Sequence, residues 1–314
     1  MNEGIGIIIK KAREEKHLTR EGICEGITTV DVLKAIETEQ SNENYWLIRE
    51  LLGRLHIQNS AVIFYLDHKD NEMVNLETEI RRDIVLHRYQ EAEQKLDTFY
   101  GLCNLKDNLQ MLIYYGLYLQ LRNQQDIKIL DDKILQNFFE NHVGYIEQHI
   151  ALHKLLSLDE LLLLMEYYEN TIENTIEKMN KFYRMMDYYD SEYAKEKYAH
   201  PFYASLKLYY AKYQYEMQEY EGCIRQCEEG LKVSEYFRTC ERNAELYELM
   251  ADAKGRIECQ KNDGTKQDRK AIEEILQAYY CADALYDTFY YGYQDKEKEL
   301  LQRKMEAWRI MILH

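Results

Sequence analysis

The sequence predicts an all-α protein in which a compact bundle of short helices precedes a longer array of helices. One proline and 13 glycines in 314 residues leave few positions where a helix has to end. Apolar residues recur mainly at helical spacing, and the alternation typical of strands is scarce. Helical segments of similar length then follow one another between short polar breaks, as in α-solenoids. We therefore divide the chain into a bundle over residues 1–66, a polar linker over 67–75 and an array over 76–314.

The charge balance is acidic throughout. The chain has 40 Lys and Arg residues against 56 Asp and Glu residues, a net charge of −16. Residues 1–66 hold eight basic and ten acidic residues, so this segment carries −2 and the remainder −14. Such a balance supports solubility and opposes non-specific attraction to nucleic acid, so any contact with DNA has to be local.

Cysteine usage and hydropathy indicate a cytoplasmic protein. Seven cysteines without CxxC spacing favour a reducing compartment over a disulfide framework or a standard zinc module. The longest apolar runs, 61–66 and 161–165, are far too short to span a bilayer.

Residues 5–57 parse into four short helices. Thr19 is the expected N-cap of the second, and Thr28 or Thr29 that of the third. Spacing then predicts the side chains that close the core of the bundle. These are Ile8, Ile9, Ala12, Val32, Leu33, Ile36, Trp46, Leu47, Leu51, Leu52 and Leu55.

Two short patterns in this bundle carry a resemblance. Arg13 stands five positions before the pair Leu18 and Thr19, and a second pattern, Leu-x-x-Ile-Glu, ends at Glu37. Together with the caps and apolar positions, they resemble the helix-turn-helix of phage repressors and xenobiotic-response-element regulators. The resemblance implies a five-helix DNA-binding domain that acts as a homodimer, with the second helix of the motif in the major groove and the first across the backbone.

The same resemblance nominates residues that would contact DNA. Thr19 and Arg20 would approach phosphate, and a local basic cluster includes Lys10 and Lys11. The residues that would face base edges are Thr29, Val30, Asp31, Lys34 and Ala35.

Four positions depart from the family pattern. Arg20 replaces the usual Gln, and Val30 and Ala35 cannot make bidentate hydrogen bonds to bases. Glu39 stands where a glycine is common, which makes a left-handed turn there less comfortable. An alternative therefore stays open, in which the bundle is a docking or dimerisation module that does not bind DNA.

Helical repeats are clearest at residues 206–231, which resemble a tetratricopeptide repeat. Its characteristic positions correspond to Ala211, Tyr220, Cys223, Cys227 and Gly230. Residues 80–99 form a weaker copy around Ala92, and the pairs 106–122 with 126–140 and 241–260 with 266–291 have suitable lengths. Residues 142–200 depart most from the pattern and contain a predicted capping box at Ser157 and Glu160.

The domain order resembles that of the peptide-responsive quorum-sensing regulators of Gram-positive bacteria. The resemblance implies a homodimeric transcription regulator whose repeats bind a short signalling peptide on their concave face, where side chains can pair with the peptide backbone. Asn170 and Asn174, four residues apart, are expected to share a helix face. The full set of predicted peptide-binding residues is Arg81, Gln120, Asn170, Asn174, Ser205, Lys212, Tyr215, Glu216, Asp252 and Arg256.

Signals for catalysis are weak. The sequence lacks a P-loop and the GxGxxG, GxSxG and HExxH motifs, so we expect neither an enzyme nor a cofactor. His149 and His153 are the best candidate metal pair, but no second ligand pair follows, and we expect no metal site. Two alternatives to peptide-controlled transcription remain, a helical-repeat protein-interaction module and a regulator that responds to a small molecule.

Overall fold

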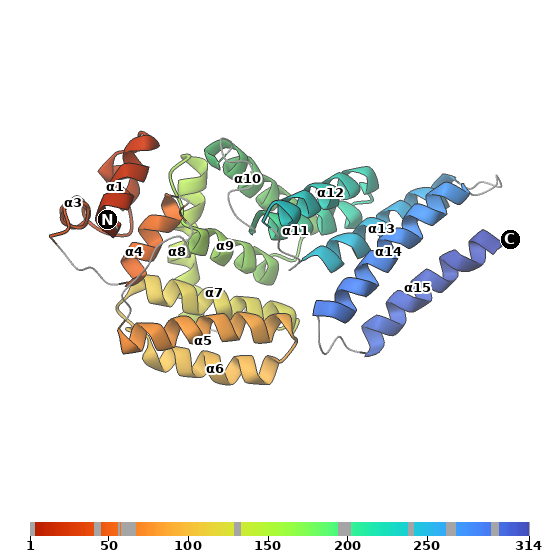
Figure 1. Cartoon of the computed structure of the whole chain (residues 1–314), viewed down its shortest axis with the longest axis horizontal. Helices are drawn as coiled ribbons and strands as arrows, with labels where there is room; N and C mark the ends of the chain where they lie inside the picture. Colours follow the sequence, from red (N-terminus) through yellow and green to blue (C-terminus); the bar gives the residue numbers. More distant parts are fainter. Residues whose placement is uncertain are drawn as a thin grey trace. The chain divides into compact units, whose positions relative to one another are not determined.

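The computed structural model describes residues 4–40, 45–55, 57, 67–128, 133–193, 202–237, 242–261, 268–289 and 295–313. Every regular element within these ranges is an α-helix (Figure 1). The chain divides into two compact units, the first formed by residues 1–84 and 88–171 and the second by residues 85–87 and 172–314. The prediction of an all-α protein is confirmed. None of the described helices is both long and apolar enough to cross a membrane.

The first unit begins with four short helices, α1 (Ile5–Glu15), α2 (Arg20–Cys24), α3 (Val30–Glu37) and α4 (Tyr45–Arg54). The hydroxyl of Thr19 accepts a hydrogen bond from the amide of Gly22, and that of Thr29 accepts one from the amide of Val32. These N-caps satisfy amides that have no partner inside their helices. The four helices and the predicted caps are thereby confirmed, with Thr29 as the cap of α3. Any fifth helix of this bundle lies outside the described residues.

The core of this bundle follows most of the predicted apolar spacing, except that Ile8 is only partly buried and that Ile23, which the spacing did not predict, is fully buried. Its fully buried members are Ile9, Ile23, Leu33, Leu51, Leu52 and Leu55. Trp46 differs from the prediction, because it packs with Met73 and Phe99 in the core formed by the next three helices. Its indole Nε1 donates a hydrogen bond of 2.8 Å to Asp70, which satisfies the one polar atom of the ring.

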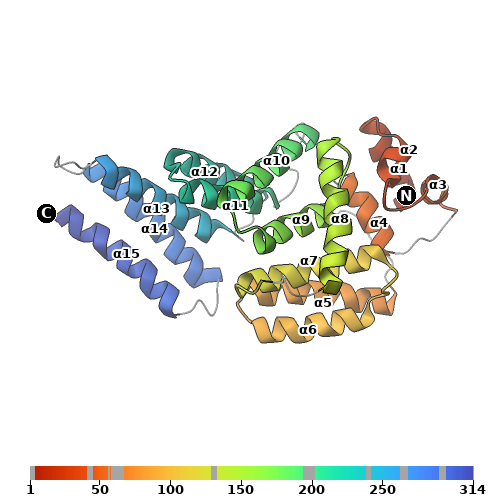
Figure 2. The ribbon, with the colours of Figure 1, turned by 180° about the vertical axis from the view of Figure 1, so that it is seen from behind.

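Helices α5 (His68–Val85), α6 (Tyr89–Leu102) and α7 (Asn108–Gln124) lie side by side (Figure 2). Ala92, Leu96 and Phe99 are buried between them. The segment 67–75, predicted as a polar linker, is helical from His68 onward. Met73 anchors it, because this side chain is fully buried on the inner face of α5.

Helices α8 (Lys133–Ala151) and α9 (Leu158–Thr171) complete the first unit. The predicted capping box is present at the start of α9, since the Glu160 amide donates to Ser157 Oγ and the Ser157 amide donates to Glu160 Oε2. Asn123 of α7 donates hydrogen bonds to the backbone carbonyl and the carboxylate of Glu166, which fixes α9 against α7.

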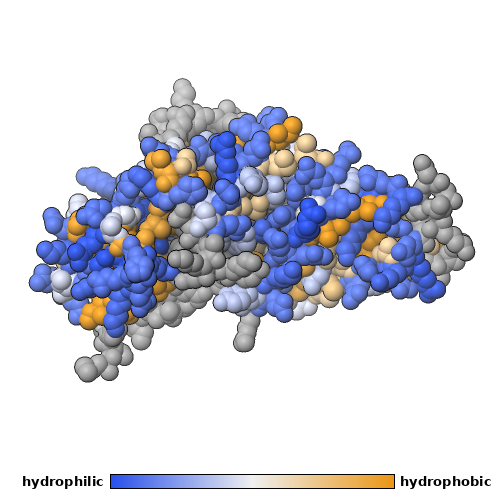
Figure 3. All heavy atoms as spheres, turned by 90° about the horizontal axis from the view of Figure 1, so that it is seen from above, coloured by the Kyte–Doolittle hydropathy of each residue, from blue (hydrophilic) through white to orange (hydrophobic). Residues whose placement is uncertain are grey.

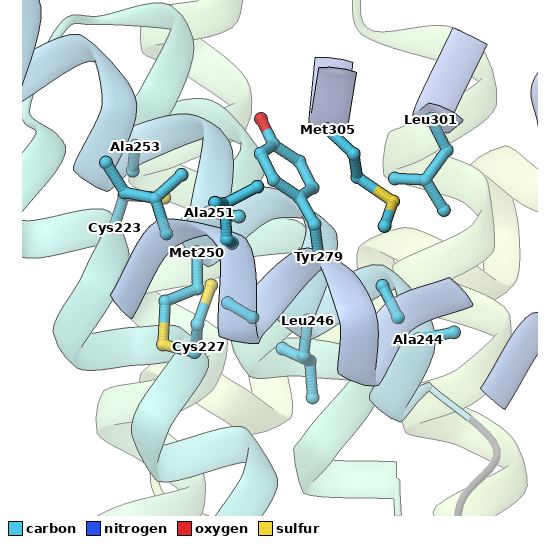
Figure 4. Packing of buried hydrophobic residues seen from close by; sticks show 14 of the residues in the cluster. Cys223, Cys227, Ala244, Leu246, Met250, Ala251, Ala253, Tyr279, Leu301 and Met305 are labelled. Carbon is cyan, nitrogen blue, oxygen red and sulfur yellow. The ribbon is translucent and has the colours of Figure 1, made fainter. Parts of the chain in front are cut away.

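The second unit contains α10 (Thr175–Tyr193), α11 (Phe202–Glu216), α12 (Tyr220–Phe237), α13 (Asn243–Lys261), α14 (Arg269–Phe289) and α15 (Asp295–Leu313). Consecutive helices pack against one another, as in a helical solenoid. Ala211, Cys223 and Cys227 are fully buried, in agreement with the predicted repeat positions. They belong to a core that extends through α13 and α14 to Leu301 and Met305 of α15 (Figure 4).

The described part of the face seen from above is mainly polar (Figure 3). In the view from above, hydrophilic residues predominate and apolar side chains form small groups (Figure 3). The described chain has exposed apolar side chains, among them Leu105 between α6 and α7, Tyr183 on α10, Tyr236 on α12 and Leu300 on α15.

Candidate functional site

A buried ion cluster holds the first three helices together. Arg13 Nε of α1 donates a hydrogen bond of 2.6 Å to Glu37 Oε1 at the end of α3, and Arg13 Nη2 reaches Glu37 Oε2 at 3.1 Å. Arg20 at the start of α2 donates to the same carboxylate at 2.7 Å. Burial raises the pKa of the Glu37 carboxyl, but the hydrogen bonds from Arg13 and Arg20 outweigh it and hold that pKa below its ordinary value. Both motif residues of the sequence resemblance therefore take part in one charge-paired junction.

The predicted base-facing residues lie at the start and along the outer side of α3. Asp31 and Lys34 are exposed, and Val30 and Ala35 are partly exposed. Thr29 is exposed, but its hydroxyl is occupied as the cap of α3. These five residues thus lie at the exposed start and along the exposed side of α3, whose end is bonded through the buried Glu37 to α1 and α2.

The predicted phosphate-contacting residues differ in their availability. Lys10, Lys11 and Thr19 are exposed. The side chain of Arg20 is 34% exposed and its guanidinium is bonded to Glu37, so it has a structural role that the sequence pattern does not reveal. Contact between these residues and DNA stays a prediction.

Two residues with a left-handed backbone conformation lie before and after α3. Gly26, in the turn before the helix, has φ +75°, and Glu39, just after it, has φ +57°. The chain therefore makes the left-handed turn expected at Glu39 without the glycine that would favour it.

The turn between α2 and α3, residues 25–29, also contacts the later helices of the first unit. Arg54 Nη1 donates to the carbonyls of Ile23 and Glu25, and the Tyr145 hydroxyl of α8 donates to Glu25 as well. The prediction from sequence missed Arg54 and Tyr145. No local sequence pattern predicts these contacts, because Arg54 and Glu25 are 29 positions apart and Tyr145 and Glu25 are 120 positions apart.

A charged cluster joins α4 to α5 and α9. Arg49 is bonded to Glu77 of α5 at 2.5 Å and to Asp159 of α9 at 3.0 Å. Glu50 is 1% exposed, and within the described part of the chain its two carboxylate oxygens accept no hydrogen bond of ordinary geometry. Burial, together with the nearby charges of Asp159 and Glu160, raises the pKa of Glu50 to about 8.

In the second unit, several predicted peptide-binding residues meet on α11 and α13. Arg256 of α13 donates a hydrogen bond of 3.1 Å to the Tyr215 hydroxyl of α11, and Lys212 of α11 lies 3.9 Å from Glu245 of α13. Asp252 accepts hydrogen bonds from Lys304 of α15 and from the Tyr279 hydroxyl. Lys304 also pairs with Glu248 of α13 at 2.9 Å. We call the set formed by Lys212, Tyr215, Glu245, Glu248, Asp252, Arg256 and Lys304 the polar face of the second unit.

Two other predicted residues border this face along α11. Glu216 accepts a hydrogen bond of 2.9 Å from the Thr175 hydroxyl of α10, and Ser205 is partly buried near the start of α11. They belong to the same unit as the polar face.

The remaining predicted peptide-binding residues are dispersed. Arg81, Gln120 and Asn170 belong to the first unit, and Arg81 is bonded to Glu77. Gln120 is partly buried on α7. They therefore do not share a unit with the polar face.

The expected pairing of Asn170 with Asn174 is wrong. Asn170 lies in α9, is 1% exposed and donates to Asn123 and to the Ile127 carbonyl. The chain leaves the helix after Thr171, and Asn174 caps α10 by accepting from the Glu177 amide. The two asparagines share no helix face, because the helix breaks between them.

The candidate metal pair is also separated by a helix end. His149 lies in α8 with its Nδ1 2.8 Å from the Tyr145 carbonyl, whereas His153 follows the end of α8 at φ +50°. Their four-residue spacing therefore does not place the rings on one helix face. Among the residues that the structure describes, no cluster of three possible metal ligands occurs.

Comparison with known proteins gives two distant likenesses. No model of a protein family matches the chain, and no curated protein does either. A structure of PlcR from Bacillus thuringiensis in complex with the peptide PapR7 and DNA has a TM-score of 0.48 at 16% identity, over 98% of this chain and 99% of that one. The competence regulator ComR from Streptococcus vestibularis, in complex with its cognate signaling peptide XIP, has a TM-score of 0.47 at 14% identity, over 97% of this chain and 98% of that one.

Proposed function

We propose that the chain is a transcription regulator that binds double-stranded DNA as a homodimer through α2 and α3. The observation that carries this proposal is the junction of Glu37 with Arg13 and Arg20, which holds two capped helices so that one face of α3 stays exposed. A short helix with a fixed axis and an exposed polar face is what insertion into a major groove requires.

DNA binding is tested with labelled duplexes that tile the region upstream of the chain's own gene. We expect fluorescence anisotropy to detect binding at low salt that weakens as salt rises. Lys10→Ala should lower the slope of log affinity against log salt by about 1, because one phosphate contact is lost. Lys232→Ala on α12 is the charge-matched control and should leave the slope unchanged, since Lys232 is exposed in the second unit.

Residues of α3 test the specific part of the interaction. Lys34→Ala should reduce the preference for the bound duplex over a scrambled one, since this exposed side chain lies among the proposed base-facing residues. The absence of binding to every upstream duplex, with and without peptide, would contradict the proposal.

Dimerisation has a separate test. Helix-turn-helix domains of this kind read paired half-sites, so we expect light scattering to give the mass of a dimer at micromolar concentration. A monomer at every concentration, with or without the duplex, would contradict the homodimer.

We further propose that the polar face of the second unit binds a short peptide. Its tyrosine, arginine and lysine side chains supply donors, and its carboxylates supply acceptors, for the backbone of an extended chain. Candidate peptides are those encoded by short reading frames beside the gene. In titration calorimetry, Arg256→Ala should weaken binding of the active peptide, whereas Arg225→Ala on α12 should leave it unchanged.

One observation favours a different function, a protein-interaction module without DNA binding. The guanidinium of Arg20, the basic residue at the start of α2, is already bonded to Glu37. The net charge of −2 over residues 1–66 offers little general attraction to DNA. The duplex titration separates the two functions, because only the regulator binds DNA.

A further inference from the structure

The turn between α2 and α3 is held by side chains from three later elements of the first unit. Arg54, the last residue of α4, donates to the Glu25 carbonyl at 2.6 Å and to the Ile23 carbonyl at 2.9 Å. Tyr145 of α8 donates to the Glu25 carbonyl at 2.9 Å. Lys154, between α8 and α9, forms an ion pair of 2.5 Å with the Glu25 carboxylate. Three of these four contacts thus fall on Glu25, the first residue of the turn, and the fourth falls on Ile23 near the end of α2.

Arg54 also connects this turn to α9. Its guanidinium is fully buried, and Nη2 lies 3.2 Å from Glu160 Oε1. Glu160 is itself fixed by the capping box at the start of α9, where its Oε2 accepts from the Ser157 amide at 2.6 Å. A buried, charge-paired arginine allows little independent movement of either side, because separation would leave a charge without a partner. If the start of α9 moved, Arg54 would therefore move the α2–α3 turn with it.

The side chains that hold the turn are distinct from the proposed DNA-facing ones. Thr29, Asp31 and Lys34 are exposed, whereas Arg54 is fully buried and Tyr145 makes its contact at the Glu25 carbonyl. The turn is also closely packed, because a Cβ placed on Gly26 would lie 1.9 Å from the Tyr145 hydroxyl. The α8 side chain therefore fits against the turn only while a glycine is present there.

We propose that Arg54, Tyr145 and Lys154 are positioning residues that set the orientation of α3, so that α8 and α9 control how the helix reads DNA. This inference rests on the proposed function, since it assigns the regulation of the same DNA-binding helices. After α9 the chain continues through residues 172–174 into α10, the first helix of the second unit, so a covalent route joins the regulated turn to the proposed peptide-binding unit.

The test uses the full chain and peripheral members of this contact set. Arg54→Ala would leave Glu160 and two carbonyls without a partner and could unfold the unit. The informative variant is Tyr145→Phe with Lys154→Ala, which removes one hydroxyl and one ammonium and keeps the buried core. Its matched control is Tyr203→Phe with Lys254→Ala, which removes a hydroxyl bonded to Asp190 and an ammonium paired with Glu274, all in the second unit.

The first measurement is hydrogen exchange without DNA. The Ile27 and Thr28 amides donate to the Cys24 carbonyl inside the turn. We expect them to exchange roughly threefold to tenfold faster in the test variant than in the wild type, the factor that about one net hydrogen bond supplies. In the control variant their exchange should be unchanged. Equal protection in the test variant and the wild type would overturn the proposal.

The second measurement is the ratio of affinities for the upstream duplex and a scrambled duplex of the same length. A loss of folding lowers the active fraction but leaves this ratio unchanged, whereas a misoriented α3 lowers the ratio itself. We expect it to fall roughly threefold to tenfold in the test variant and not in the control. A wild-type chain that binds no duplex contradicts the proposed function. Wild-type binding with the same ratio in the test variant contradicts only the positioning role.

Discussion

Arg13 of α1 and Glu37 of α3 are joined by two hydrogen bonds, of 2.6 and 3.1 Å, across 24 positions of the sequence. The Glu37 side chain is fully buried and that of Arg13 is 10% exposed. Arg13 also donates to the Leu18 carbonyl, so a single guanidinium holds both the end of α3 and the segment before α2. The two residues that carry the sequence resemblance are therefore direct partners in the structure.

Glu37→Gln should destabilise the first unit by about 2 kcal/mol or more, because two arginines lose their shared buried charge. The native carboxylate has a lowered pKa, so its contribution is present above the ordinary pKa and is lost as pH falls through the native one. The variant should therefore show a weaker loss of stability below about pH 4.5. Urea unfolding in a Trp308→Phe background measures this, since Trp46 then reports on the first unit. Glu299→Gln, whose pair with Arg303 is exposed, is the control and should shift stability by no more than about 0.5 kcal/mol.

Gly6→Ala should destabilise the same unit by about 1–3 kcal/mol. A Cβ at this position would lie 1.9 Å from the Ile36 carbonyl oxygen, so α1 would have to move away from α3. Gly116→Ala provides the same substitution in α7 with no neighbouring atom within 4 Å and should stabilise by up to about 1 kcal/mol. Effects of the same sign in the two variants would contradict the close approach of α1 and α3.

Glu50→Gln should flatten the pH dependence of stability between about pH 5 and 8. The native pKa of Glu50 is raised to about 8, so the folded chain keeps a proton that the unfolded chain loses near pH 4.5. The free energy of unfolding of the wild type therefore declines as pH rises through this window, and at pH 7 it has lost about 3 kcal/mol relative to pH 4.5. Urea titrations at several pH values test this, with Glu91→Gln on the exposed side of α6 as the control. Parallel profiles for wild type and Glu50→Gln would be the contrary result.

Glu39→Gly should stabilise the first unit by about 1 kcal/mol. The φ of +57° at Glu39 is unfavourable for a residue with a Cβ, and glycine removes that strain. Gln94→Gly, at an exposed position in the middle of α6, is the opposite control and should lower stability by a similar amount. Thermal unfolding of the three chains decides this, since lower stability for both variants would show that Glu39 has another role.

The sequence predicted the helices of the array more accurately than the residues that would share a site. The repeat positions Ala211, Cys223 and Cys227 are buried as expected, because helical spacing alone decides which face points inward. Asn170 and Asn174 were assigned to one face, but the break after Thr171 places them on separate helices. Short spacing is informative only where the helix is continuous.

Residues close together in the sequence thus determine some features of this protein, and the packing of distant helices determines others. The sequence alone determined the all-α class, the cap at Thr19, a cap at Thr28 or Thr29, and the capping box of Ser157 and Glu160, because each depends on residues within a few positions of one another. Only the tertiary structure decided that Glu160 also binds Arg54, since that contact spans 106 positions. Pairing of buried charges depends on which helices meet, and no local pattern specifies that meeting.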